Sequence, residues 1–395
     1  MSERIAITGI GIISALGMNV QENLYALKNS ESGIGKMSFI KSIHQDEFPV
    51  GEVKKTDREL AEYLAIPYER TYTRTSLLAM VAAKEAWLDA GDPLEDKCGL
   101  ISATTVAGMR TSEENYVDFI AYKEDDFFVE AHDAGDGTEK VADFLNITDF
   151  ITTISTACSS SANSIMLGAR MLKAHKLDRV LVGGVDALSL FTINGFNTLM
   201  ILDKEACKSF DNKRAGLNLG EAAAYLVLVP EHKLKKTDRV YGFVQGYANA
   251  NDAFHQTASS PNGMGAALAM EKALKSAAYT ASDIDYINAH GTATNNNDLS
   301  EGMAIMKVFG QEIPDLSSTK PFTGHTLAAA GAVEAVFSCL AMQNDIRFPN
   351  LNFNEQMEEL DFSPITTVIK KPVKTVLSNS FGFGGNNSTL IFSKE

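Results

Sequence analysis

The sequence predicts an α/β fold in which helices cover a largely buried sheet. Short apolar runs alternate along the chain with helical patterns, which is typical of layered α/β proteins. The runs at 180–182 and 225–229 are continuously apolar, as strands buried on both faces are. A third run, at 5–13, has the same character and is far too short to span a bilayer, so we expect a buried strand there.

The same order of elements occurs twice along the chain. A helical pattern followed by a strand appears at two corresponding places in each half. The four pairs are 83–91 with 98–104, 159–173 with 179–184, 270–278 with 284–290, and 325–342 with 373–378.

We therefore expect two similar halves, an N-terminal one over 1–245 and a C-terminal one over 246–395. The acidic segment near 112–144 has no counterpart in the second half. We interpret it as an insertion that serves as a lid or as a dimer element.

Composition and charge exclude several functions. The formal net charge of −15 argues against a nucleic-acid partner, because phosphate neutralisation needs clustered lysine and arginine. None of the four cysteines forms a CxxC pair, so neither a metal site nor a disulfide framework is predicted. The N-terminus lacks the features of a signal peptide, and no stretch approaches a transmembrane length. We expect a cytoplasmic protein without a membrane span.

Cys158 is the candidate nucleophile. It lies among small residues at 155–161, where a helix is expected to begin. Unpaired N–H groups and the positive end of the helix dipole should stabilise the thiolate there and lower its pKa. A buried structural role is the alternative for any free cysteine, and we assign that role to Cys98, Cys207 and Cys339.

Two of the seven histidines also lie in turns of small residues. His290 ends a predicted strand, and strand ends carry functional sites in α/β folds. His325 is expected at a helix N-terminus, where the dipole disfavours a cation and keeps the imidazole neutral. Lys320 precedes it by five residues. A structural hydrogen bond is the alternative role for each histidine taken alone.

A glycine-rich turn follows the last predicted strand, at 381–387. It lacks the GxGxxG spacing of dinucleotide sites, whereas its backbone N–H groups can form half of an oxyanion hole. The alternative is a tight turn that needs positive φ angles. A thiol with two imidazole donors is a suitable set for acyl transfer followed by carbon–carbon bond formation.

Together these segments resemble the β-ketoacyl-acyl-carrier-protein synthases of the elongating Cys-His-His class, within the thiolase superfamily. The resemblance covers nearly the whole chain, and all three motifs occur in the family's order. It implies a duplicated five-layer α/β/α/β/α fold that is normally dimeric.

The resemblance also implies roles for the matching residues. Cys158 would be the acylated nucleophile, with His290 and His325 as the pair for decarboxylation. Lys320 matches the lysine that supports the second histidine. Phe383 matches a gating phenylalanine whose N–H joins that of Cys158 in the oxyanion hole.

Four further positions follow from the same resemblance. Glu301 and Phe381 are expected to support the site, and Thr292 and Thr294 to bind the pantetheine arm. The implied reaction condenses an acyl group on Cys158 with malonyl-acyl-carrier protein, giving β-ketoacyl-acyl-carrier protein and carbon dioxide, in fatty-acid elongation. It requires no cofactor of the enzyme, because the carrier protein supplies the phosphopantetheine.

The expected partner, an acyl carrier protein, is acidic, and this chain is acidic too. A local basic patch must therefore exist for docking. Ordinary solvated surface charges are the alternative. The candidate patch is formed by Arg70, Arg74, Lys208, Lys213 and Arg214.

The sequence departs from the family pattern around the expected pocket. Three asparagines stand at 295–297 in place of the usual proline and glycine, and Asn163 stands where a histidine is frequent. Because of these departures a second reading stays open, a specialised type II polyene or polyketide synthase in a heterodimer with a chain-length-factor subunit instead of a homodimer. A non-condensing acyl-binding subunit, and a hydrolase or acyltransferase using Cys158 with one histidine, fit less well because the cysteine and both histidines are present.

Overall fold

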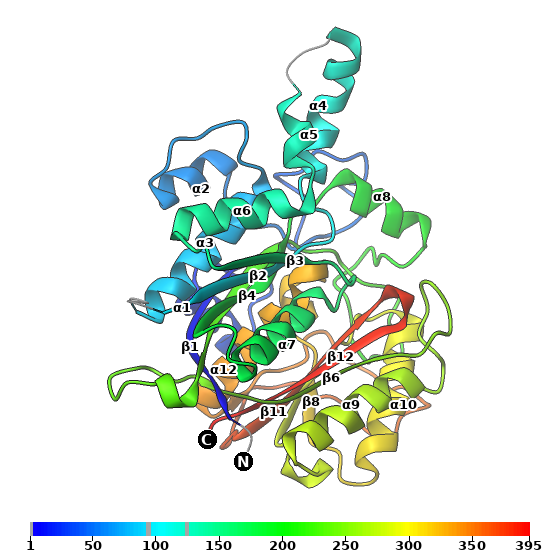
Figure 1. Cartoon of the computed structure of the whole chain (residues 1–395). Coiled ribbons are helices and arrows are strands. Elements are labelled where there is room, and N and C mark those ends of the chain that lie inside the picture. Colours follow the sequence, from blue (N-terminus) through cyan, green and yellow to red (C-terminus); the bar gives the residue numbers. More distant parts are fainter. Residues whose placement is uncertain (1–2, 92–95, 123–125) are drawn as a thin grey trace.

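The centre of the molecule is a ten-stranded sheet, seen in a computed structural model that describes residues 3–91, 96–122 and 126–395 (Figure 1). In spatial order its strands are β3 (Phe150–Ile154), β2 (Cys98–Ala103), β4 (Arg179–Asp186), β5 (Ala222–Pro230), β1 (Ile5–Ile13), β6 (Gly242–Asn251), β12 (Asn386–Ser393), β11 (Thr375–Gly382), β7 (Tyr286–Asn288) and β8 (Asp315–Ser317). A separate two-stranded sheet pairs β9 (Ile346–Arg347) with β10 (Ile369–Lys370).

The strand order repeats itself. β3, β2 and β4 are parallel to one another, and β5 and β1 follow antiparallel. From the other edge, β8, β7 and β11 are parallel, and β12 and β6 follow antiparallel. The two sets join where Ala6 and Ile7 of β1 pair with Phe243 and Gly242 of β6. The repeat agrees with the duplication predicted from the sequence, while the division at residue 245, which falls inside β6, stays a prediction.

Helices form three layers around this sheet. In chain order they are α1 (Val20–Lys28), α2 (Asp57–Leu64), α3 (Arg74–Asp89), α4 (Met109–Tyr122), α5 (Phe127–Ala131), α6 (Ala134–Leu145), α7 (Ser160–Lys173), α8 (Leu190–Thr198), α9 (Met264–Ala277), α10 (Asn295–Phe309), α11 (Lys320–Thr323) and α12 (Ala330–Asn344). α7 and α12 lie between the two halves of the sheet (Figure 1). α3 with α6 covers one outer face, and α9 with α10 covers the other. The α/β class and the five-layer order are thus confirmed.

The helix expected over 325–342 begins later than predicted. Leu327 has a φ of +52°, which an α-helix does not accommodate, so a short 3-10 turn at Leu327–Ala329 precedes α12. The stretch Leu327–Asn344 is long and apolar enough to cross a membrane, contrary to our expectation that no such stretch exists. Because 89% of it is buried inside the chain, it is the central core helix of this fold.

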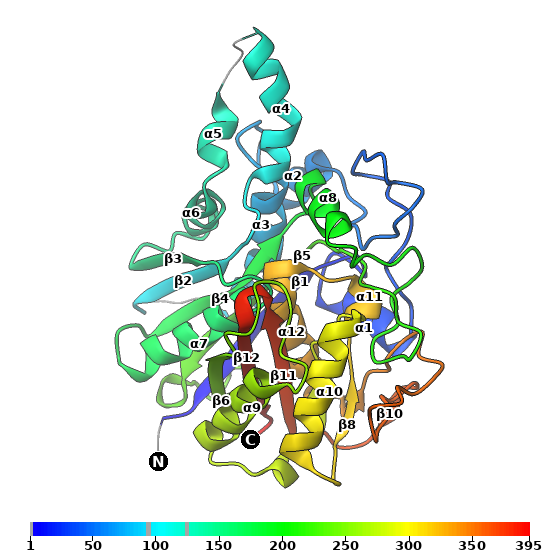
Figure 2. The ribbon, with the colours of Figure 1, turned by 90° about the vertical axis from the view of Figure 1, so that its right-hand side faces the viewer.

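The insertion near 112–144 divides into two structural parts. α6 packs on α3 and buries Val141 and Ala142 in the core. α4 buries none of its residues and, with α5, projects from the body of the molecule (Figure 2). Its role as a lid or dimer element stays a prediction.

Candidate active site

The turn between β3 and α7 presents Cys158. Ala157, just before it, has a φ of +53°, which is uncommon for a residue with a side chain and marks a sharp elbow. The cysteine itself is buried, with 7% exposure, and lines a cavity of about 210 Å³. His290, His325 and Phe383 line the same cavity, so residues from distant parts of the sequence meet there.

The pKa of the Cys158 thiol differs from the prediction. Burial raises it to about 11, although the charge of Lys320 and the backbone N–H of Phe383 act in the opposite direction. The expectation that the helix terminus lowers this pKa was therefore wrong in its net result. Desolvation of the thiolate outweighs the dipole, because the thiol lies inside the molecule and not at its surface.

His290 is held in one orientation from both sides. Its backbone N–H and that of Gly291 donate to the carboxylate of Glu301, at 2.9 and 2.8 Å. On the side-chain end, Lys320 Nζ lies 3.2 Å from His290 Nδ1. An ammonium group has donors but no acceptor, so Nδ1 must accept and the ring proton sits on Nε2. Burial and the Lys320 charge lower the pKa of His290 well below its usual value, so the ring is neutral.

The contact of Lys320 corrects one expectation. The resemblance implies that this lysine supports His325, but its ammonium group contacts His290 instead, at both Nδ1 and the backbone carbonyl oxygen. It also forms a buried ion pair with Glu334, with 2.5 Å between Nζ and Oε1. The carboxylate accepts a further hydrogen bond from Ser380. A buried charge without such a partner would be strongly unfavourable.

His325 has the same tautomer for a different reason. Its Nδ1 accepts a hydrogen bond from the backbone N–H of Leu327 at 3.1 Å, so its proton also lies on Nε2. Its ring meets that of His290 edge to face, with centroids 5.4 Å apart. Burial and the charge of Lys320 lower the pKa of His325 well below the ordinary value, so the ring is neutral, as the sequence predicted. The cavity therefore holds two neutral imidazoles with Nε2–H donors.

The glycine-rich turn closes the cavity from the other side. The backbone N–H of Phe383 lies close enough to the Cys158 thiol to lower its pKa. The Phe383 ring stacks on Phe196 of α8, with centroids 5.8 Å apart and planes 18° apart. Phe381 lies against the His290 ring, with a centroid distance of 5.8 Å. Gly384 and Gly385 both have positive φ, as the tight-turn alternative also requires.

Glu301, Thr292 and Thr294 lie close to the histidines. Glu301 is fully buried and accepts from Asn379 as well as from the His290 loop, and burial raises its pKa to about 7. Its hydrogen bond with the backbone N–H of His290 fixes that part of the chain. Thr292 and Thr294 line the cavity together with the asparagines at 295–297. Thr294 additionally caps α10.

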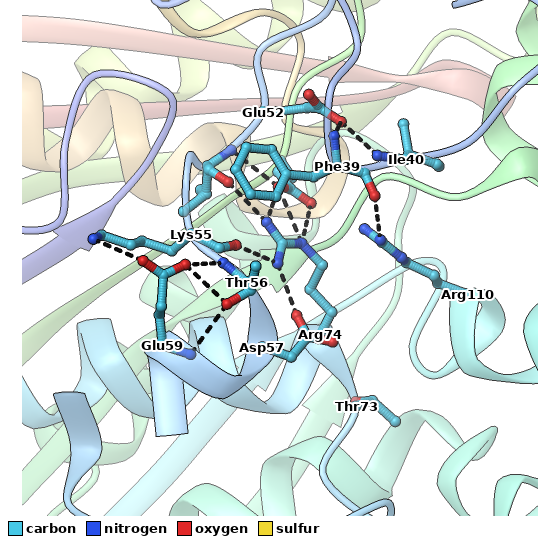
Figure 3. A network of polar contacts seen from close by, with 12 residues as sticks. Phe39, Ile40, Glu52, Lys55, Thr56, Asp57, Glu59, Thr73, Arg74 and Arg110 are labelled. Carbon is cyan, nitrogen blue, oxygen red and sulfur yellow. Dashed lines mark hydrogen bonds and ion pairs between the residues drawn. The ribbon is translucent and has the colours of Figure 1, made fainter. Parts of the chain in front are cut away.

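Arg74 does not belong to any exposed basic patch, contrary to prediction. Its side chain is 2% exposed and donates to Asp57 and to the carbonyl oxygen of Lys55 (Figure 3). It also donates to Glu221 and to the carbonyl oxygen of Val53. These contacts use all five N–H groups of the guanidinium, which leaves none for a partner protein.

The other members of the predicted patch lie at the surface or near it. Lys213 is exposed and pairs with Glu355 at 2.8 Å, and Lys208 pairs with Glu205 at 2.7 Å. Arg214 donates to the carbonyl oxygens of Thr294 and Asn295 beside the cavity. Arg70 is exposed on another part of the surface, over the ring of Phe127.

Three residues of this site escaped the sequence analysis. Glu334 is the one carboxylate in the largely apolar sequence of α12, and a single charge in such a helix could have indicated a buried ion pair. Asp186 accepts from Thr104, Thr105 and the N–H of Ala328, and so ties the turn after His325 to the strand end of β2. The role of Phe196 could not be predicted from the sequence, because a single aromatic residue in a short helix is common.

Comparisons with known proteins agree with this geometry. The family model described as "Beta-ketoacyl synthase, N-terminal domain" matches residues 2–233, and "Beta-ketoacyl synthase, C-terminal domain" matches residues 241–354. The chain is 32% identical to 3-oxoacyl-[acyl-carrier-protein] synthase 2 of Coxiella burnetii, covering 99% of this chain and 98% of that protein. It is 30% identical to the Staphylococcus aureus protein of the same name, covering 100% and 99%.

Solved structures give the same result. The ishigamide ketosynthase/chain length factor superposes with a TM-score of 0.94 at 28% identity, covering both chains fully. A ketosynthase in complex with its chain length factor, from Xenorhabdus doucetiae, has a TM-score of 0.87 at 28% identity, covering 100% of this chain and 98% of that one. The fold is thus the thiolase-like fold of ketosynthases. The chain belongs to the β-ketoacyl synthase family.

The buried ion pair of Arg74 generates a stability prediction. Arg74→Ala should lower the free energy of unfolding by about 3–5 kcal/mol, because it leaves the Glu221 carboxylate buried without its partner. Burial would raise the pKa of Glu221, yet the Arg74 charge holds it below the usual value, so this stabilisation should fade as the pH falls through that pKa. Chemical denaturation at pH 7 and at lower pH measures both effects.

Arg70→Ala is the matched control for this prediction. Arg70 is exposed and its guanidinium lies over the ring of Phe127, so its removal should cost about 1 kcal/mol or less. Equal losses of stability for the two variants would contradict the account of the Arg74 network.

Proposed function

We propose that this enzyme carries out a decarboxylative Claisen condensation, with Cys158 as the acyl carrier and His290 and His325 as the donors that stabilise the enolate. One observation carries the proposal most directly. A single cavity is lined by a thiol, by two neutral imidazoles whose Nδ1 atoms are occupied so that the ring protons lie on Nε2, and by Phe383, whose backbone N–H favours the thiolate. Hydrolysis by a cysteine needs one histidine as a base, and it has no use for two neutral donors.

The first half-reaction transfers an acyl group to Cys158. The sulfur attacks the thioester carbonyl of the donor, and the N–H groups of Cys158 and Phe383 hold the tetrahedral oxyanion. The intermediate expels the pantetheine thiol, which takes up the proton that the cysteine thiol loses. The charge of Lys320 and the N–H of Phe383 favour the thiolate and thereby oppose the effect of burial.

The second half-reaction forms the carbon–carbon bond. A malonyl thioester places its thioester carbonyl against Nε2–H of His290 and His325, and loss of carbon dioxide leaves its electron pair in the enolate. The enolate carbon attacks the acyl carbonyl on Cys158, and the sulfur departs and regains a proton. Neutral donors suit this step, because they stabilise the developing charge and stay protonated at Nε2 throughout.

The substrate arm and its carrier belong to the same proposal. Thr292 and Thr294 line the cavity and are suited to bind the amide groups of a phosphopantetheine arm, which an acyl carrier protein supplies. Three basic residues lie close together in the sequence, namely Lys208, Lys213 and Arg214. Arg214 connects them to the cavity, because it donates to the carbonyl oxygens of Thr294 and Asn295. The three residues form the proposed docking patch, with Arg70 as a separate exposed charge. The reaction proposed here needs no metal and no cofactor of the enzyme's own, and its carrier-bound substrates suit a cytoplasmic location.

A second candidate is a type II polyene or polyketide ketosynthase that works with a chain-length-factor subunit. The observation that favours it is the likeness to ketosynthases solved together with a chain length factor, with TM-scores of 0.94 and 0.87 over the full chain. The chemistry at Cys158 is the same in both readings. They differ in the acyl group accepted and in whether the dimer contains two copies of this chain or one copy with a related subunit.

We predict that Cys158 alone carries the acyl group. Incubation with a panel of acyl-carrier proteins should give an acyl adduct on the wild type and none on Cys158→Ala, as measured by intact-protein mass spectrometry. Cys207→Ala, a second buried cysteine at 0% exposure, is the matched control and should load normally. Loading of Cys158→Ala would refute the nucleophile assignment. Loading that requires a co-purified subunit would favour the second candidate.

We predict that reversal of the docking patch weakens only carrier recognition. Lys208→Glu with Lys213→Glu should raise KM for carrier-bound substrate and leave turnover of acyl-pantetheine unchanged, because both side chains lie outside the cavity. Lys272→Glu with Lys275→Glu changes the net charge equally at exposed positions of α9 and should leave both KM values unchanged. Equal effects of the two double variants would show that net charge, and not a local patch, controls docking.

A further inference from the structure

The two N–H groups of the proposed oxyanion hole come from distant parts of the chain. Cys158 lies in the turn before α7, whereas Phe383 lies in the turn between β11 and β12. The two turns touch, since a Cβ placed on Gly382 would lie 3.1 Å from the backbone nitrogen of Cys158. An oxyanion hole works only if its two N–H donors keep a fixed separation. Other contacts must therefore fix the position of one turn relative to the other.

A cluster of side-chain amides and hydroxyls spans the same two turns. Asn386 lies at its centre, three residues after Phe383, and its Oδ1 accepts from Asn249 Nδ2 at 2.6 Å. Ser159 Oγ lies 2.8 Å from the same oxygen and 2.8 Å from the carbonyl oxygen of Thr156, so the two acceptors share its one proton. Asn163 Nδ2 approaches the same oxygen at 3.3 Å. The members of this amide cluster are Thr156, Ser159, Asn163, Asn249, Asn386 and Ser388.

The amide cluster forms hydrogen bonds with the nucleophile turn on both sides of Cys158. Ser159 follows the cysteine directly, is fully buried, and contacts Asn386. Thr156 precedes the cysteine by two residues, and its Oγ1 accepts from Asn163 Nδ2 at 2.8 Å. Asn163 in turn accepts from Asn249 and from Ser388, at 3.2 and 3.1 Å. The chain thus links the start of α7 to β6 and β12 through polar side chains.

We propose that Asn386 is a positioning residue for acyl transfer, which acts by fixing the nucleophile turn against the turn that carries Phe383. Its one acceptor oxygen receives donors from the nucleophile turn, from α7 and from β6, so it sets the distance between the N–H groups of Cys158 and Phe383. The inference rests on the proposed function and adds the side chain that aligns its oxyanion hole.

The cluster is separate from the two histidines. Lys320, Glu334 and Glu301 fix His290, and the backbone of Leu327 fixes the His325 ring. None of the hydrogen bonds of the amide cluster reaches these groups among the described residues. A defect in Asn386 should therefore slow transfer of the acyl group to Cys158 and spare decarboxylation of the malonyl thioester.

The experiment compares Asn386→Leu with Asn386→Asp in the full-length protein. Leucine keeps the side-chain shape without an acceptor, whereas aspartate keeps the acceptor oxygen. The rate of acyl-Cys158 formation from acyl-pantetheine is followed by quenched intact-protein mass spectrometry, and malonyl-pantetheine decarboxylation is followed by carbon dioxide release. Rates are compared at several pH values for each variant, because the added carboxylate raises the pKa of the thiol.

Asn386→Leu should slow acylation by about 10- to 100-fold, the effect of a small misplacement of reacting groups, and change decarboxylation less than about 2-fold. Asn386→Asp should restore acylation to near the wild-type rate. Ser159→Ala removes the same link from the other turn, so it should slow acylation too, and combining it with Asn386→Leu should add little further loss.

Three results would overturn the inference: normal acylation by Asn386→Leu, equal loss of acylation and decarboxylation, or no rescue by aspartate. If Asn386→Leu does not fold, Ser159→Ala tests the same link, and its normal acylation would be equally decisive. A wild type that neither loads an acyl group nor releases carbon dioxide would instead refute the proposed function itself.

Discussion

The buried ammonium group of Lys320 is the constraint on which the rest of the site depends. It lies between His290 and Glu334, with a side chain that is 4% exposed. Because it can only donate, it fixes the proton of His290 on Nε2. Its charge also disfavours a second cation at either histidine and favours the thiolate of Cys158. One side chain thus acts on the charge state of all three groups, together with burial at the two histidines and against burial at the cysteine. Its ion pair with Glu334 offsets the cost of burying its charge.

The duplicated fold explains how these groups come together. β3 and β8 are the two edges of the ten-stranded sheet and occupy equivalent places in the repeat. The chain leaves β3 through the Cys158 turn into α7, and it leaves β8 through the His325 turn into α12. The nucleophile and one donor therefore occupy corresponding positions in two copies of the same arrangement. α7 and α12 pack against each other at the centre, which brings both turns to one cavity.

The sequence predicts what depends on local pattern and residue type. Apolar runs indicated the buried strands, and turns of small residues indicated the functional cysteine and both histidines. Contacts between distant residues left no such signal. Arg74 looked like a surface cation at the start of a helix, because its buried partner lies 147 residues away. Leu327 gave no indication of its positive φ, and the burial that raises the pKa of Cys158 depends on the complete fold. The contact of Lys320 with the first histidine is likewise a product of tertiary structure.

The central claim is that His290 and His325 are neutral Nε2–H donors, and nitrogen NMR of the histidine rings tests it most directly. With ¹⁵N-labelled protein, His290→Ala and His325→Ala assign the two sets of ring signals. Both rings should show the Nε2–H tautomer unchanged from pH 5.5 to pH 8, because burial and Lys320 keep both pKa values well below 6.5. Titration of either ring near pH 6.5, or a proton found on Nδ1, would contradict the account.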